Sequence, residues 1–325
     1  MSFSSDVKDE LSRQYSSARH CQIAEIAAII SMNGKVMISV DDRFCIKVHT
    51  ENVAVARKFF TLIRKVFQAQ TEISIRQNAY LKKSRTYIIT IPEHEDCMKI
   101  LQAAKLLNEY QEVEEEMSMV NNIILQRSCC KRAFIRGAFL ASGSISDPEK
   151  TYHFEIVCAS REKAEQLREI INSFEMDAKI VLRKKYFVVY IKEGSQIVDI
   201  LNVMEAHVAL MKLENVRILK EMRNSVNRKV NCETANINKT VSAAIKQAED
   251  IKYIRDTIGF ERLSEGLEEI AWMRLKHPDA TLKELGAMLS PPVGKSGVNH
   301  RLRKLSNIAE SLRENKEENY DNENN

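Results

Sequence analysis

Two stretches of sequence decide the fold: AEIAAIISMNG at residues 24–34 and RAFIRGAFLASG at residues 132–143. Each is apolar, contains several alanines or glycines, and ends on a glycine. These final glycines, Gly34 and Gly143, are 109 positions apart. Because small side chains let two helix backbones approach closely, the stretches predict a pair of helices that pack against each other in the core.

The residues after each glycine repeat one order of elements. After Gly34, the apolar patterning predicts strands at 36–40 and 43–50, a helix at 51–67, strands at 73–77 and 85–91, and a helix at 94–107. After Gly143, it predicts a strand at 152–160, a helix at 161–174, a hairpin at 178–193 and a helix at 195–204. We therefore predict an α+β fold with a duplicated αββαββα domain. It spans 21–212, with halves at about 21–110 and 129–212, and follows an N-terminal helix within 1–20.

This plan resembles that of the LAGLIDADG homing endonucleases. In that family an acid just before the final glycine of each signature helix holds the catalytic metal, whereas this chain has Asn33 and Ser142 there. The resemblance implies that the two sheets form a saddle over duplex DNA, and the missing acids imply that the protein is not an enzyme. A residual metal-dependent nuclease that uses Asp41, Asp42 or Asp147 instead is the weaker alternative.

Composition and cysteine spacing exclude several classes of protein. No run of 18 apolar residues and no secretory signal is present, so neither a membrane span nor export is expected. The seven cysteines form no pair of CxxC motifs, so we predict no disulfide framework, no metal site and no cofactor. Reduced thiols fit a cytoplasmic protein. The adjacent Cys129 and Cys130 are interpreted as two thiols on opposite sides of a helix start, with redox sensing as the alternative.

Charge is unevenly distributed along the chain. The net charge is +4, but the residues from Glu314 to Asn325 contribute −4, and we predict a disordered acidic tail at 313–325. Residues 215–239 carry a net charge of +4 with sparse apolar periodicity, which predicts a linker at 213–236. Its basic side chains could contact a DNA backbone or simply be solvated. A helical domain is expected at 237–312.

The segment 275–308 has the layout of a helix-turn-helix motif. Thr281 and Glu284 have the spacing of a capping box, a break follows at 290–294, and a final helix begins around Ser296. The ten residues 295–304 contain four basic side chains and no acid. Such a stretch favours an anionic partner, and we predict double-stranded DNA. The predicted DNA-binding residues are Lys295, Ser296, Asn299, His300, Arg301, Arg303 and Lys304.

These residues have different expected roles. Asn299, His300 and Arg303 point outward near the start of the second helix, where side chains reach base edges in the major groove. Lys295, Arg301 and Lys304 are expected to contact phosphates. Ser296, in the first turn, lies among free backbone amides that suit a phosphate.

Four strings closely resemble the bacterial WhiA family over nearly the whole chain. They are MSFSSDVKDEL at 1–11, CCKRAFIRGAFLASGSISDPEK at 129–150, NRKVNCETAN at 227–236 and PPVGKSGVNHRLRKL at 291–305. The resemblance implies a degenerate LAGLIDADG-like domain and a C-terminal helix-turn-helix domain. It also implies a cytoplasmic, nucleoid-associated regulator of transcription in cell division and chromosome segregation, or of sporulation in some relatives. A second transcription factor or a division or nucleoid protein could bind the LAGLIDADG-like domain. A scaffold for such proteins, without sequence-specific DNA binding, is the alternative.

Overall fold

The computed structural model describes residues 2–38, 43–77, 85–107 and 122–323, and the side chains of the last helix as far as Glu314. The chain divides into two compact units, Met1–Glu221 and Met222–Asn325. Each unit is described by itself. None of the described helices is long and apolar enough to cross a membrane.

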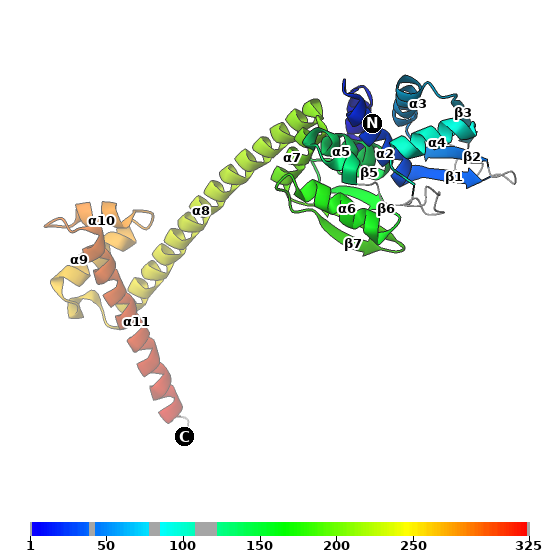
Figure 1. Ribbon diagram of the computed structural model, residues 1–325. Coiled ribbons are helices and arrows are strands. Elements are labelled where there is room, and N and C mark those ends of the chain that lie inside the picture. The colour runs from blue at the N-terminus through cyan, green and yellow to red at the C-terminus, as the bar shows by residue number, and fades with distance from the viewer. Residues whose placement is uncertain (1, 39–42, 78–84, 108–121, 324–325) are drawn as a thin grey trace. The chain divides into compact units, whose positions relative to one another are not determined.

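The first unit contains the duplicated domain (Figure 1). An N-terminal helix, α1 (Phe3–Ser12), precedes it, and a short 3₁₀ helix, η1 (Asn122–Leu125), stands before the second half. The first half contains α2 (Arg19–Asn33), β1 (Gly34–Ile38), β2 (Phe44–Thr50), α3 (Val53–Phe67), β3 (Glu72–Gln77), β4 (Arg85–Ile91) and α4 (His94–Ala103). The second half contains α5 (Ser128–Ser142), β5 (Gly143–Ile145), β6 (Phe154–Cys158), α6 (Arg161–Asn172), β7 (Lys179–Arg183), β8 (Tyr186–Ile191) and α7 (Gly194–Met204). The order αββαββα in each half confirms the predicted fold class.

Each half has its own antiparallel sheet, in the strand order β1-β2-β4-β3 in the first half and β5-β6-β8-β7 in the second. In β2 the side chains of Ile46, Val48 and Thr50 are buried, whereas those of Lys47 and His49 between them are only half-buried. Because successive side chains of a strand point to opposite faces, each sheet packs one face on the helices. The other face is left for a partner or solvent.

The two signature helices, α2 and α5, pack against each other as predicted (Figure 1). A Cβ atom added to Gly137 would lie 2.6 Å from the carbonyl oxygen of Glu25 and 2.9 Å from Cβ of Ala28. The backbones are therefore too close for any side chain at this position. This contact explains the small residues of both stretches.

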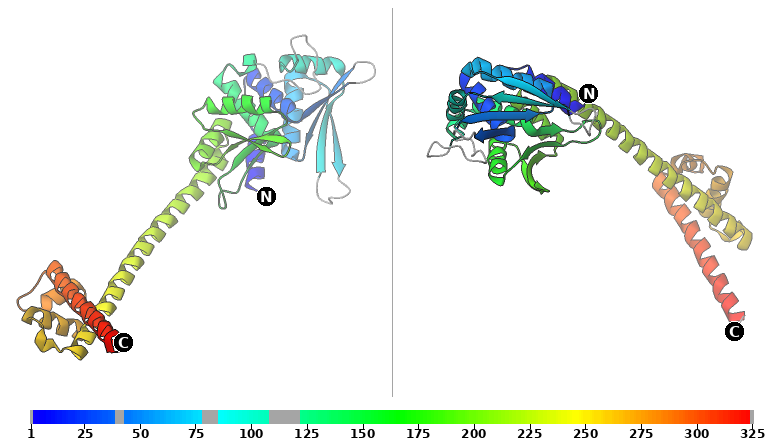
Figure 2. Two further views of the ribbon diagram at one scale, coloured as in Figure 1. Left: turned by 90° about the horizontal axis from the view of Figure 1, so that it is seen from below. Right: turned by 90° about the vertical axis from the view of Figure 1, so that its right-hand side faces the viewer.

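A single long helix, α8 (His207–Thr257), takes the place of the predicted linker (Figures 1 and 2). No glycine or proline interrupts residues 207–257, so the segment lacks the two residue types that disfavour a helix most. Leu213, near its start, belongs to the core of the first unit, and Ile251 and Ile254, near its end, belong to the core of the second. The helix ends just before Gly259, whose φ is +74° and so in the region that favours glycine.

The second unit is entirely helical. After the end of α8 come η2 (Phe260–Arg262), α9 (Glu265–Lys276), α10 (Leu282–Met288) and α11 (Lys295–Glu323). Trp272 of α9 is 54% exposed, and its ring packs edge-on against Phe260. It lies on the outer side of α9, whose neighbouring Ile270 and Ala271 are buried. The helix α11 also continues into the predicted disordered tail, whose Glu, Lys and Arg residues are good helix formers.

Candidate nucleic-acid interface

The first helix of the motif, α10, is fixed at both ends. The backbone NH of Glu284 donates to Oγ1 of Thr281 over 3.3 Å, and the NH of Thr281 donates to the Glu284 carboxylate over 2.8 Å. This confirms the predicted capping box, and the hydrogen bonds from Thr281 hold the pKa of Glu284 below its usual range. At the turn, the NH of Val293 donates to the carbonyl of Gly286 over 2.9 Å. A Cβ at Gly286 would lie 2.0 Å from the Val293 carbonyl oxygen, so the turn requires glycine there.

The second helix, α11, has one buried and one exposed side. Its apolar side packs on α9 and α10 through Val298, Leu302 and Leu305, each at most 1% exposed. On the exposed side lie six of the seven predicted DNA-binding residues: Lys295, Ser296, Asn299, His300, Arg303 and Lys304. Between residues 295 and 304, α11 therefore presents a polar, basic side without acids, while the other side holds the motif together.

Arg301, the seventh predicted residue, is half-buried and points elsewhere. Its Nη1 donates to the carbonyl oxygen of Gly266 at the start of α9, over 3.3 Å. The guanidinium thus joins α11 to α9. Its phosphate contact stays a prediction.

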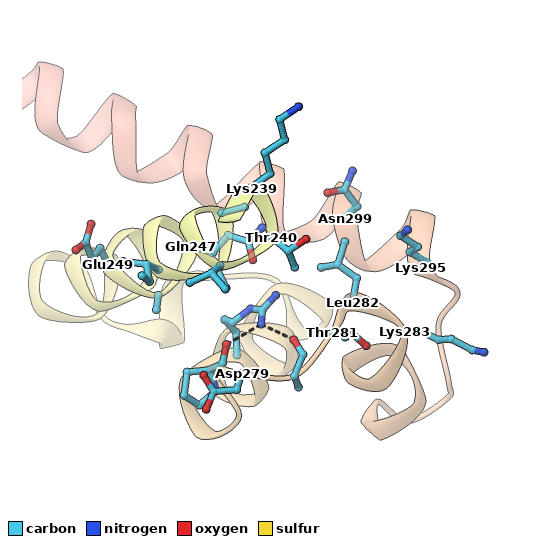
Figure 3. A pocket seen from close by; sticks show the side chains of 18 of the residues that line it. Lys239, Thr240, Gln247, Glu249, Asp279, Thr281, Leu282, Lys283, Lys295 and Asn299 are labelled. Atoms are coloured by element: carbon cyan, nitrogen blue, oxygen red, sulfur yellow. Dashed lines mark hydrogen bonds between the residues drawn. The ribbon is translucent and has the colours of Figure 1, made fainter. Parts of the chain in front are cut away.

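A groove of about 840 Å³ runs beside the amino end of α11 (Figure 3). Lys295 and Asn299 line it together with Lys239 of α8 and Lys283 of α10. Lys239 ends the basic segment 215–239, for which DNA contact and solvation were both left open. Lys283 was not predicted, because a lysine on a helix is usually only a solvated charge. Only their position beside α11 distinguishes them. Beneath them Arg274, 2% exposed, donates to the carbonyls of Pro278 and Ala280 and fixes the turn before α10.

The open face of the first sheet carries a second cluster of positive charge. The register places Lys35 opposite Lys47 and Glu72 opposite Thr90, so Lys35, Lys47 and Arg76 share the face that bears His49. Burial, and then the positive charges of Lys35, Arg76 and Lys47, lower the pKa of His49. This face therefore attracts anions.

The open face of the second sheet is more balanced in charge. The carboxylate of Glu155 accepts from Oγ of Ser144 over 3.1 Å and lies 3.1 Å from a nitrogen of Arg183 and 3.0 Å from Nε2 of His153. These partners outweigh the effect of burial, which alone would raise the pKa of Glu155, and hold that pKa below its usual range. Arg183 is thereby partly neutralised. Among the residues that the structure describes, the three cations around His49 share one acid on their face of the sheet, Glu72.

The ends of α2 and α5 do not fit the divalent cation of a LAGLIDADG nuclease. Nδ2 of Asn33 donates to the carbonyls of Ala141, over 2.8 Å, and His49, over 3.3 Å. The hydroxyl of Ser142 lies 3.5 Å from the Ala138 carbonyl. A magnesium ion would meet an amide nitrogen and a hydroxyl in place of two carboxylates. Of the alternative acids, the carboxylate of Asp147 caps a turn by accepting from the NH of Glu149, and residues 41 and 42 lie outside the described residues.

Comparison with known proteins finds similarity over nearly the whole chain. The family models of the WhiA N-terminal LAGLIDADG-like domain, the WhiA LAGLIDADG-like domain and the WhiA C-terminal HTH domain match residues 19–107, 131–223 and 226–309. The "Probable cell division protein WhiA" of Lachnoclostridium phytofermentans is 59% identical over 97% of this chain and 100% of its own length. Its counterpart in Alkaliphilus oremlandii is 53% identical over 97% and 99%. The crystal structure of full-length DUF199/WhiA from Thermatoga maritima has a TM-score of 0.59 at 25% identity, over 96% of this chain and 99% of that one.

Proposed function

The chain belongs to the WhiA family, and on that premise we propose that it is a non-catalytic protein that binds double-stranded DNA sequence-specifically. In this proposal it regulates transcription in connection with cell division and chromosome segregation, as a cytoplasmic, nucleoid-associated protein. The name shared by its relatives in Lachnoclostridium and Alkaliphilus supports the link to division. The replacement of both signature acids by Asn33 and Ser142 supports the absence of catalysis.

One observation carries the proposal: α11 is amphipathic, with apolar residues on its buried side and polar residues on its exposed side. Val298, Leu302 and Leu305 are buried, while Asn299 and Arg303 are exposed on the same turns. A recognition helix needs this division, because its outer side must enter the major groove while its inner side stays packed. Asn can pair with adenine and Arg with guanine, each through two hydrogen bonds.

Binding to a duplex, measured against salt concentration, tests the proposal. The variant Arg303→Ala with Lys304→Ala should bind more weakly, and each lost phosphate contact should reduce the log–log salt slope by roughly 0.9. The matched control is Arg255→Ala with Lys276→Ala. It removes the same charge from a hollow beside Trp272, which shares no lining residue with the groove next to α11. An unchanged affinity and slope in the first variant, or equal losses in both, would contradict the assignment.

The open face of the first sheet is proposed as a second DNA contact. Lys35, Lys47 and Arg76 favour a phosphate backbone over an apolar protein partner. Replacing all three with alanine should lower both affinity and salt slope while leaving the preferred sequence unchanged. If DNA binding is unaffected by this triple variant, the face is available for a protein partner instead.

Two alternative functions are separated by simple experiments. A scaffold without sequence specificity would give a flat profile in genome-wide crosslinking with sequencing, whereas a regulator would be enriched at discrete sites that share a motif. A residual nuclease would nick supercoiled plasmid in the presence of magnesium. We expect enrichment in the first experiment and intact plasmid in the second.

A further inference from the structure

The amino ends of α2 and α5 bring four metal-binding side chains together. His20 and Cys21 lie in the first turn of α2, and Cys129 and Cys130 lie in the first turn of α5. Their candidate ligand atoms all lie within 4.8 Å of one another. Nδ1 of His20 is 3.1 Å from Sγ of Cys130 and 3.3 Å from Sγ of Cys21.

The duplication of the domain explains this convergence. His20–Cys21 and Cys129–Cys130 are separated by 109 positions, the same offset that separates the two signature glycines. Each half therefore contributes two ligands from equivalent positions. Since α2 and α5 pack on each other, these positions meet.

The distances among the four ligand atoms suit a metal ion with tetrahedral coordination. Zinc binds sulfur at about 2.3 Å and imidazole nitrogen at about 2.0–2.1 Å, so tetrahedral geometry places two sulfurs about 3.8 Å apart and a sulfur and a nitrogen about 3.5 Å apart. The two nitrogen–sulfur distances from His20, 3.1 and 3.3 Å, are already near the second value. The longest separation must close by about 1 Å, a displacement that side-chain rotation supplies.

The surroundings suit a structural site. Cys21 and Cys130 are 5% and 3% exposed and pack among Ala24 and Ala133, which exclude water from one side. Cys129 is exposed, so an ion can enter from solvent.

A neighbouring cation completes the charge balance. Three thiolates around Zn²⁺ carry a net charge of −1, and the exposed Arg127 stands beside them, with Nη1 3.4 Å from Nε2 of His20. Coordination through Nδ1 would leave the ring proton on Nε2, so the Arg127 guanidinium would turn from the ring toward the thiolates.

We propose that His20, Cys21, Cys129 and Cys130 form a closed zinc site that joins the amino ends of the two central helices. Sites with four protein ligands are typically structural, and their metal stabilises the fold directly. Zinc binding would deprotonate the three thiols and release their protons to solvent. The site is independent of the proposed DNA contacts, which lie on α11 and on the open face of the first sheet.

The metal content of the full chain, purified without chelators, tests this proposal. We expect about one zinc ion per chain, and replacement with cobalt(II) should give the visible bands of tetrahedral coordination and a thiolate charge-transfer band. His20→Ala and Cys130→Ser should weaken metal binding by more than the roughly 10- to 100-fold that loss of an outer-sphere partner costs. His20→Cys should retain the ion, because it supplies a fourth thiolate. The exposed Cys232→Ser on α8 is the matched control and should keep full occupancy.

Several outcomes would overturn the proposal. One is that the wild-type chain contains no zinc and its cobalt spectrum lacks the thiolate charge-transfer band. Another is that the thiols are oxidised to a disulfide and no metal is bound. Equal zinc content in wild type and Cys130→Ser would place the ion elsewhere. The cobalt spectrum of the wild type keeps the test decisive even if a variant fails to fold.

Discussion

Arg136 of α5 forms a fully buried ion pair with Glu25 of α2: Nη2 lies 3.3 Å from Oε2, and the side chains are 2% and 0% exposed. Lys58 of α3 binds the other oxygen of Glu25, and Glu205 binds the guanidinium from a more exposed position. Burial disfavours the charged guanidinium, but the two carboxylates outweigh it and raise the pKa of Arg136. One carboxylate thus holds cations from two helices in the centre of the first unit.

Glu25→Gln should therefore destabilise the first unit strongly. The change leaves Arg136 and Lys58 buried without their shared anion, and breaking a buried pair costs about 3–5 kcal/mol. Trp272, the only tryptophan, lies in the second unit, so its fluorescence reports that unit alone. In urea unfolding followed by circular dichroism, the first unit of the variant should unfold at a lower urea concentration than in the wild type. The transition followed by tryptophan fluorescence should keep its wild-type midpoint.

The surface pair of Arg161 and Glu165 provides the control for this experiment. Both side chains are more than 40% exposed, so Glu165→Gln should cost at most about 1 kcal/mol. If both variants lose a similar free energy of unfolding, the buried pair stabilises the protein no more than the surface pair does.

Asn33→Asp should also destabilise the first unit, for a different reason. The amide nitrogen that donates to the carbonyls of Ala141 and His49 would become a carboxylate oxygen facing them. Losing these bonds and burying an unpaired acceptor costs about 1–3 kcal/mol. Thermal unfolding followed by circular dichroism would measure the loss. If the variant is as stable as the wild type, the fold tolerates a carboxylate at position 33.

Lys8 of α1 gives a pH-dependent prediction. Its half-buried amine lies over the ring of Phe139, and desolvation lowers its pKa from 10.5 to about 8. Below pH 8 the lysine is charged in both states, so its cost to folding is fully present. As pH rises from 8 to 10.5 the folded protein has lost the proton that the unfolded chain still binds, so the cost disappears.

Lys8→Met should accordingly stabilise the protein at pH 7 by about 2 kcal/mol, since one pKa unit corresponds to about 1.4 kcal/mol and partial exposure reduces the effect. The gain should shrink as pH approaches 10. Urea unfolding at both pH values measures it. The exposed Lys185→Met should change stability by less than about 0.5 kcal/mol at either pH. A gain at Lys8 that does not vary with pH would contradict the desolvation argument.

Gly286→Ala should disrupt the second unit alone. Its new Cβ would lie 2.0 Å from the backbone carbonyl of Val293, which no side-chain rotation relieves. Overpacking of this kind costs about 1–3 kcal/mol, so the tryptophan transition should move while the first unit is unaffected. Gly294→Ala, where a Cβ would meet nothing within 4 Å, is the control. If the tryptophan transition of Gly286→Ala occurs at the same urea concentration as in the wild type, the turn can relax to accept the extra methyl group.

Local chemistry made much of this structure predictable from sequence. Thr281 and Glu284 form a capping box that depends only on residues three apart, and the αββαββα order follows from apolar periodicity and its repetition after Gly34 and Gly143. Properties set by tertiary packing cannot be predicted in the same way. Nothing local distinguishes an exposed Trp272 from a buried one.

The cysteine cluster was missed for a related reason. CxxC motifs place two ligands within one turn of chain, but His20–Cys21 and Cys129–Cys130 come from separate halves and meet only when α2 packs on α5. The signal was present in the repeat itself, since both pairs stand at the same offset as the signature glycines. Aligning the two halves residue by residue would have placed the four side chains at equivalent positions.

Base contacts and phosphate contacts on α11 should respond differently to substitution. Asn299→Ala removes a side chain proposed to read a base, so it should cost about 1–3 kcal/mol on the preferred site and little on other sequences. Lys304→Ala removes a proposed phosphate contact, so it should weaken all sequences alike and reduce the salt slope by about 1. Binding to a panel of single-base variants of the operator, at two salt concentrations, distinguishes them. If Asn299→Ala weakens every duplex equally, Asn299 contacts the backbone, and the reading of bases must lie with His300 or Arg303.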